Sequence, residues 1–413
     1  MFSIKLGLRN LTRQKRRNFI TALVIAYAFF AYLFVDSIME GMEEMSFKNI
    51  IDFNTGHIQI ANPDYWEERE ELSLDNLLYL NPEVQKSLES VEEISGVSPE
   101  LKFSASLNNG IDEMPVIGLG IDPEQYKTVF ITQDYLVAGT MIFSGEYQAI
   151  MGAGLARLMD LRLNDNITLL VRTKEETFNA IDVEVVGLFR TPNPMIDGST
   201  VFLPLDIVQQ SLNADEQISM VSIRINQEKE KNTVVGNLNQ LFREGNLKIE
   251  AYTWEESAET VVALSVAKKS GIGVVLLVVL LIGVVGIVNN IILSALERTE
   301  EIGMMKALGM KETEIVLTFM VEAVGIGILG GLLGCLLGAI GVGLMSKYGY
   351  SLGYIGGDMS VYGIPILDKI YGVWNFQAFV FLFFLGVIVA LISSIAPAWW
   401  AAHKDPVKAI YHR

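Results

Sequence analysis

The sequence predicts an integral membrane α-helical protein with four transmembrane helices and a large extracytoplasmic α+β domain of two subdomains between the first two of them. Three observations support this fold class. Half of the 413 residues are hydrophobic (51%) and 19% are charged, whereas about 25% are charged in an average soluble domain. Four apolar stretches reach the roughly 20 residues that a helix needs to cross a bilayer. Most of the acidic residues behind the net charge of −17 lie in one block between the first two stretches.

The first apolar stretch, Phe19 to Val35, follows a cluster of basic residues, as in a signal peptide. However, it is longer than the usual signal-peptide core of about 7–15 residues, and no small-x-small cleavage pattern follows it. We therefore expect a retained span. The predicted order along the chain is an amphipathic elbow (1–17), span one (18–38), the extracytoplasmic domain (39–269), span two (270–294), a cytoplasmic segment (295–313), span three (314–346), an outer loop (347–373), span four (374–397, closed by Pro397) and a tail (398–413).

Basic residues predict the orientation, because they are enriched on the cytoplasmic side of membrane helices. Both the N-terminal cluster and the tail, with Lys404, Lys408 and Arg413, are basic. An even number of spans puts the two termini on the same side, so both are expected in the cytoplasm and the acidic domain outside.

The third span is rich in glycine, and Gly330, Gly334 and Gly338 recur every four residues on one helix face. Small residues at this spacing allow close packing between membrane helices. Packing among the four spans is the simpler interpretation, and a subunit interface is the alternative. Glu322 is the one carboxylate in a span, and we expect it to pack against or couple to a neighbouring span. Proton transport is a remote third interpretation.

The acidic block alternates short strand-like and helical segments, which predicts an α+β domain. Strands are expected at 57–60, 114–119, 166–171, 181–186 and 220–225, and helices at 82–91, 152–159 and 232–242. His57 is its single histidine, and the sequence shows no metal-ligand spacing and no nucleophile motif. The composition also argues against nucleic-acid binding, which needs a basic surface, and against a disulfide scaffold, because Cys335 is the only cysteine. We therefore expect no metal and no catalytic site on this chain.

The most specific segment is ERTxEIGxxKALG at residues 297–309, in the predicted cytoplasmic connection. It predicts a short helix that ends at Gly309, because glycine is favoured just after the last helical turn. Ile302, Met305 and Leu308 are expected to form an apolar knob on one side, flanked by Glu301 and Lys306.

This segment resembles the signature of the FtsX/MacB-type permease superfamily of ABC transporters. Three further places resemble the family: LRNLxRxKRR at 8–17, the Glu322 segment with its glycines, and the end of the chain, with proline at 397 and DPVKAI at 405–410. The resemblance covers the whole chain. It implies a MacB-like periplasmic core domain and a multi-pass protein of the bacterial inner membrane, with the large domain in the periplasm.

The resemblance also implies that two permeases, identical or different, assemble with a dimer of ATPases. In that family the segment at 301–309 docks on the ATPase. The expected coupling residues are Glu301, Ile302, Gly303, Met305, Lys306, Ala307, Leu308 and Gly309. Because the sequence has no P-loop motif, ATP and Mg²⁺ are expected on the partner, and this chain is expected to be a non-catalytic subunit without a cofactor.

Within the superfamily, segments 56–60, 186–189 and 197–205 resemble the lipoprotein-releasing (LolC/LolE) branch. That branch implies an acylated lipoprotein as substrate, with membrane lipid around it. A periplasmic lipoprotein carrier is a further partner that some members of the branch recruit. The expected substrate-lining residues are Tyr32, Phe34, Ile38, Met42, Met45, Val262, Leu264 and Val266, since flexible apolar side chains adapt to varied acyl chains. For any one of these residues, helix packing is an equal alternative. MacB-like efflux or peptide export is the alternative function, followed by an FtsX-like activator of cell-wall hydrolases. The sequence does not identify the cargo.

Overall fold

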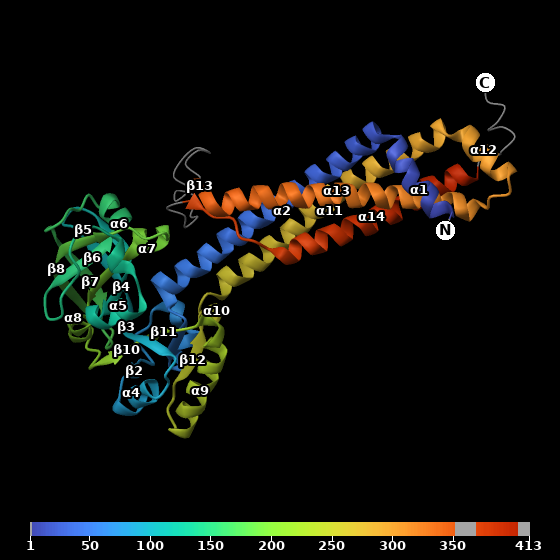
Figure 1. Ribbon diagram of the computed structural model, residues 1–413. Helices are drawn as coiled ribbons and strands as arrows, with labels where there is room; N and C mark the ends of the chain where they lie inside the picture. Colours follow the sequence, from blue (N-terminus) through green and yellow to red (C-terminus); the bar gives the residue numbers. More distant parts are fainter. Residues whose placement is uncertain (1, 352–368, 404–413) are drawn as a thin grey trace. The chain divides into compact units, whose positions relative to one another are not determined.

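The computed structural model describes residues 2–351 and 369–403, which form two compact units. The helical unit contains residues 2–44, 264–351 and 369–403, and the α+β unit contains residues 45–263 (Figure 1). Residues 404–413, where the basic tail and the DPVKAI motif lie, and most of the predicted outer loop are outside the described residues.

Among residues 2–351 and 369–403, four helices are long and apolar enough to cross a membrane, as predicted. They are α2 (Lys15–Ile50), α11 (Glu259–Glu297), α13 (Glu312–Tyr348) and α14 (Phe376–Ala402). The helical unit also contains α1 (Phe2–Arg13), α12 (Thr299–Ala307) and a short pair of strands, β13 (Tyr350–Ser351) and β14 (Lys369–Ile370).

The helices differ from the predicted spans at their ends. Helix α2 continues to Ile50 and α11 begins at Glu259, because bilayer thickness limits the apolar stretch but not the helix that contains it. Pro397 does not close the fourth span, since it lies inside α14, which continues to Ala402. A proline removes one backbone donor, and membrane helices tolerate that loss where neighbouring groups satisfy the backbone.

The glycine face of α13 lies against α2. A Cβ atom at Gly330 would lie 2.8 Å from Ile25 Cβ, and one at Gly334 would lie 2.6 Å from Phe29 Cβ. At Gly338 the corresponding distance to Leu33 Cδ1 is 2.6 Å. The glycines and the residues that they contact both recur every four positions, so two helix faces meet along their length. On its other sides α13 packs beside α14 and α1 (Figure 1).

The α+β unit contains a ten-stranded sheet in the order β12-β1-β11-β3-β4-β9-β6-β8-β5, with β7 paired to β3 and β8. The strands are β1 (Ile58–Ala61), β3 (Ile94–Asn108), β4 (Glu113–Ile121), β5 (Leu136–Gly139), β6 (Gln148–Gly152), β7 (Asn166–Arg172), β8 (Phe178–Phe189), β9 (Thr200–Pro204), β11 (Met220–Ile225) and β12 (Glu250–Thr253). Strands β2 (Leu78–Tyr79) and β10 (Gln217–Ile218) form a separate pair.

Short helices cover the sheet and connect its strands. They are α3 (Pro63–Glu67), α4 (Pro82–Glu89), α5 (Pro123–Val129), α6 (Ala153–Leu158), α7 (Pro194–Ser199), α8 (Leu205–Ser211), α9 (Lys231–Glu244) and α10 (Trp254–Ser257), with a π-helical turn, η1 (Ile51–Thr55), after α2 and 3₁₀ turns η2 (Arg69–Glu71), η3 (Thr132–Tyr135) and η4 (Glu228–Glu230). All the strands and helices that the sequence predicted in this region are present.

The two predicted subdomains correspond to separate cores on one continuous sheet. Helices α4 and α9 pack on β1 and β11 around Val84, Leu88, Val234 and Leu238. The middle of the domain has its own larger core, built on β3, β4 and β6 to β9. The long strand β3 pairs with β4 along one edge, and along its other edge it pairs first with β11 and then with β7, so it joins the two halves.

The close approach of α13 to α2 predicts opposite effects for the same substitution at two glycines. Alanine normally stabilises a helix by about 1 kcal/mol relative to glycine. At Gly334 that gain is outweighed by a clash, which costs about 1–3 kcal/mol in a packed interior. We therefore expect Gly334→Ala to lower the thermal unfolding temperature of the purified chain.

Gly273→Ala in α11 is the matched control, because a Cβ there meets no atom within 4 Å in the described part of the chain. It should leave the unfolding temperature unchanged or raise it. Equal effects of the two substitutions would contradict the packing of α13 on α2.

Candidate coupling site at the end of the helical bundle

Helix α12 follows α11 after a sharp break at Arg298, where φ is −111° and ψ is 21°. The hydroxyl of Thr299 donates to the carbonyl oxygens of Ala295 (3.0 Å) and Leu296 (2.8 Å) and so fixes the turn. The helix ends at Gly309, whose φ of +91° suits glycine. The predicted short helix and its terminal glycine are therefore present.

One face of α12 is buried in the bundle and the opposite face is exposed. Ile302 is 4% exposed and belongs to the apolar core of the bundle, and Met305 packs against the same core. Gly303 is also buried. On the opposite face Met304 is 54% exposed and Leu308 is 88% exposed, and Ala307 and Gly309 are exposed beside them.

The expected composition of the apolar knob is therefore wrong. Of Ile302, Met305 and Leu308, only Leu308 is exposed, because the other two lie on the stripe that covers the bundle core. Met304, which the sequence analysis missed, is one helical turn before Leu308 on the exposed face. Both apolar stripes are visible in the sequence, but periodicity alone does not tell which one a neighbouring helix covers.

Charged residues attach α12 to the adjacent helices. Glu301 forms an ion pair with Arg13 of α1 at 2.8 Å, and Lys306 forms one with Glu312 at the start of α13 at 3.2 Å. His403 lies 3.1 Å from the other oxygen of Glu312. Each pair is partly exposed and contributes little by itself, but together they hold α12 to the end of α1 and to the beginning of α13.

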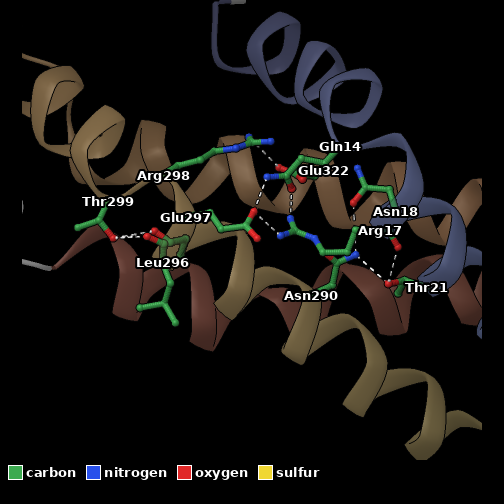
Figure 2. Close-up of polar contacts among 11 residues, drawn as sticks. Gln14, Arg17, Asn18, Thr21, Asn290, Leu296, Glu297, Arg298, Thr299 and Glu322 are labelled. Carbon is green, nitrogen blue, oxygen red and sulfur yellow. Dashed lines mark hydrogen bonds and ion pairs between the residues drawn. The ribbon is translucent and has the colours of Figure 1, made fainter.

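A polar network joins the start of α2 to the end of α11 (Figure 2). Glu297 accepts hydrogen bonds from Gln14 and Arg17, both at 2.8 Å. Deeper in the bundle, the amide of Asn290 donates to Thr21 Oγ1 at 2.9 Å and to Asn18 Oδ1 at 3.3 Å. Such polar contacts hold helices together in a bilayer, where the hydrophobic effect between helices is weak. The sequence analysis did not identify this network.

Glu322 of α13 faces Arg298 at the break between α11 and α12. The distance from Arg298 Nη1 to Glu322 Oε2 is 3.6 Å, and the two side chains are 7% and 2% exposed. Neither carboxylate oxygen of Glu322 has a hydrogen-bond partner among residues 2–351 and 369–403. A buried pair of opposite charges therefore holds the break between α11 and α12 against α13.

The expected substrate-lining residues do not share one environment. Tyr32 is buried in the core of the bundle, and Phe34, Ile38 and Met42 are partly buried along α2. Met45 and Val262 belong to the α+β unit, where Val262 packs on a cluster around Trp254. Leu264 and Val266 are 54% and 61% exposed at the start of α11.

The described residues contain no group of three or more His, Cys, Asp or Glu side chains that could hold a metal ion. Within the same ranges the charged groups at this end of the bundle pair with one another rather than line a binding cleft.

Two family models match the chain. Residues 18–241 match the MacB-like periplasmic core domain, and residues 273–406 match the FtsX-like permease C-terminal model. Among curated proteins, the chain is similar to the macrolide export ATP-binding/permease protein MacB of Escherichia coli, with 24% identity over 98% of this chain and 60% of that protein. It is also similar to an uncharacterized ABC transporter permease of Methanocaldococcus jannaschii, with 24% identity over 64% of this chain and 62% of the relative. The chain thus spans about 60% of the length of these relatives.

Two solved structures are similar to parts of the chain. One is the periplasmic region of MacB from Actinobacillus actinomycetemcomitans, with 13% identity, a TM-score of 0.36, and coverage of 52% of this chain and 95% of that one. The other is the extracellular domain of the transporter YknZ from Gram-positive bacteria, with 14% identity, a TM-score of 0.34, and coverage of 48% and 100%.

The buried pair of Arg298 and Glu322 predicts a specific mutational pattern. Removing one partner leaves an unpaired buried charge, which costs roughly 3–5 kcal/mol, whereas replacing both by apolar residues is often neutral. We expect Glu322→Leu and Arg298→Met each to lower the thermal unfolding temperature of the purified chain, and the double variant to recover most of the loss. A double variant with the summed loss of the two single variants would show that the pair makes no energetic contact.

Proposed function

Because the chain belongs to the FtsX/MacB-type superfamily of ABC transporter permeases, we propose that it couples ATP hydrolysis by a partner to movement of its extracytoplasmic domain and thereby drives export. The observation that carries this proposal is the two-faced helix α12. Its inner face is anchored in the bundle through Ile302, and its outer face presents Met304 and Leu308 to solvent. Exposed apolar residues next to each other on a short helix are typical of a docking surface.

ATP hydrolysis would take place outside these 413 residues. The sequence contains no P-loop, which cradles the phosphates and supplies a Mg²⁺ ligand in such ATPases. The relatives named ATP-binding/permease protein are longer than this chain, which covers 60% of the Escherichia coli protein. A dimer of ATP-binding partners docked on two copies of α12, each from one permease subunit, would supply the driving force.

The contacts around α12 offer a path for that force. A movement of α12 would act on α13 through Arg298 and Glu322, on α1 through Glu301 and Arg13, and on α2 through the Glu297 network. Helices α2 and α11 each continue without a break into the chain of the α+β unit. A long helix transmits displacement along its axis because every residue is hydrogen-bonded to its neighbours.

Four apolar helices and the family indicate an inner-membrane protein. In the proposed topology both termini are cytoplasmic and the α+β unit is periplasmic. This topology would place α12 on the cytoplasmic side of the membrane, where an ATPase partner can bind it.

We propose that the transporter exports an apolar or amphipathic compound. The names of the curated relatives favour the MacB-like alternative over lipoprotein release. Release of acylated lipoproteins is the second candidate. It is favoured by the exposed apolar side chains of Leu264 and Val266, two of the residues expected to line an entry path between the first two spans.

The docking proposal is tested by placing a charge on the exposed face of α12. We expect Leu308→Asp, and Met304→Asp to a similar degree, to abolish the stimulation of the partner's ATPase by the reconstituted permease, because an aspartate cannot be buried in an apolar contact without a large penalty. Thermal unfolding of both variants should match that of the parent chain, since neither side chain packs in the bundle.

Leu158→Asp is the matched control, because Leu158 is a similarly exposed leucine (66%) on α6 of the extracytoplasmic domain. It should leave the stimulation unchanged. Normal stimulation in both α12 variants would remove the docking assignment.

Substrate class is tested in cells with photocrosslinking residues at Phe34, Met42 and Val262, combined with a deletion strain. Under the export proposal, deletion raises the intracellular accumulation of a macrolide, and the crosslinkers capture no acylated lipoprotein. Capture of lipoproteins with unchanged macrolide accumulation would instead establish the lipoprotein-release alternative.

A further inference from the structure

The α+β unit contains a cavity of about 330 Å³ that the coupling mechanism does not use. Its base is one face of five neighbouring strands, β1, β11, β3, β4 and β9. Residues from η1, η2, α5, α7 and α10 complete the lining. The volume is at the lower end of the range for pockets that bind small organic molecules, roughly 300–1,000 Å³.

The strand register places polar residues at one side of this base and apolar residues at the other. Gln59 of β1 lies opposite Ser222 of β11, and in the next pair Met220 of β11 lies opposite Glu100 of β3. Further across, Leu119 of β4 lies opposite Phe202 of β9. Because side chains alternate between the two faces of a strand, these residues share the face that forms the base of the cavity.

Glu100 is the central polar residue of the cavity. Its side chain is 1% exposed, and its Oε1 atom has no hydrogen-bond partner within the described part of the chain. The other oxygen, Oε2, lies 3.9 Å from Lys102 Nζ. Burial raises the pKa of Glu100, while the nearby Lys102 and Ser222 act in the opposite direction. A buried acceptor without a partner destabilises the fold, so a hydrogen-bond donor supplied by a ligand would be bound favourably here.

The apolar side of the cavity is aromatic. Tyr126 of α5 and Phe130, the residue after this helix, are stacked with ring centroids 4.6 Å apart, and the ring of Tyr126 lies 5.6 Å from the ring of Phe202. Leu119 extends this surface, and all four residues line the cavity. Met195 of α7 also lines it and is 77% exposed, which places a flexible apolar side chain at the solvent-accessible edge. Aromatic rings of this kind give large contact areas at a low entropy cost.

We propose that this cavity binds a small organic amine, with its ammonium group donating to Glu100 Oε1 and its apolar body against Tyr126, Phe202 and Leu119. An amine is favoured over an anion because the unpaired atom at the centre is an acceptor, and because Lys102 already pairs with the second oxygen of Glu100. The extracytoplasmic domain would then recognise a ligand itself, in addition to moving under the force from α12.

Tryptamine is a suitable probe, since it combines an indole ring with a primary amine. Binding to the full chain in nanodiscs is measured by saturation-transfer NMR and by titration. We expect saturable tryptamine binding to the parent chain and none of indole-3-propionate, which carries a carboxylate on the same ring. Glu100→Gln should weaken tryptamine binding by roughly tenfold or more, as expected for the loss of one charged hydrogen bond.

Two further variants keep the test decisive even if the Glu100→Gln variant does not fold. Thr200→Trp, at a buried position of β9 that lines the cavity, should fill the space and abolish binding. Glu184→Gln, at an exposed position of β8, should leave binding unchanged. The proposal is overturned if tryptamine does not bind the folded parent chain, or if Thr200→Trp binds it as well as the parent does. ATPase stimulation is not part of this readout, so the result does not depend on the coupling proposal.

Discussion

The attachment of α12 to the bundle is the interaction on which the proposed mechanism depends. Ile302 is buried in the same apolar core as residues of α2, α11, α13 and α14. Arg298, at the break before α12, meets Glu322 of α13 inside the bundle. If α12 were loosely attached, a force from a docked partner would only rotate it about the break at Arg298 and would not reach the other helices. In the proposed mechanism, the apolar anchor and the buried charge pair make α12 move together with the helices that hold it.

The two units are stabilised by different forces. In the helical unit, close contact between α13 and α2 depends on Gly330, Gly334 and Gly338, because van der Waals packing and polar contacts hold helices together where lipid is as apolar as the side chains. In the α+β unit, burial of apolar area from water stabilises the sheet and its helices. The cavity around Glu100 interrupts that apolar interior with a charged group.

The sequence was sufficient for features that depend on local pattern. Hydropathy identified the four spans, spacing identified the glycine face, and the ERTxEIGxxKALG motif located α12. It was not sufficient for features that depend on distant segments. The choice between the Ile302 and Leu308 faces of α12 depends on what the bundle covers. The pairing of Glu322 with Arg298 depends on how α11 and α13 pack. Strand β3 was not predicted, and the position of Glu100 beside β11 and β4 depends on a register that no short segment determines.

The central claim is that α12 drives the extracytoplasmic domain, and a distance measurement tests it most directly. With Cys335 replaced by serine, spin labels are attached at Glu89→Cys on α4 and Lys347→Cys at the far end of α13, both exposed positions. The distance between the two spin labels is then measured by double electron–electron resonance in the complex with the ATP-binding partner, with and without ATP. We expect ATP to shift the distance distribution in the parent chain but not in the Leu308→Asp variant. An equal shift in both, or no shift in the parent chain, would contradict the central claim.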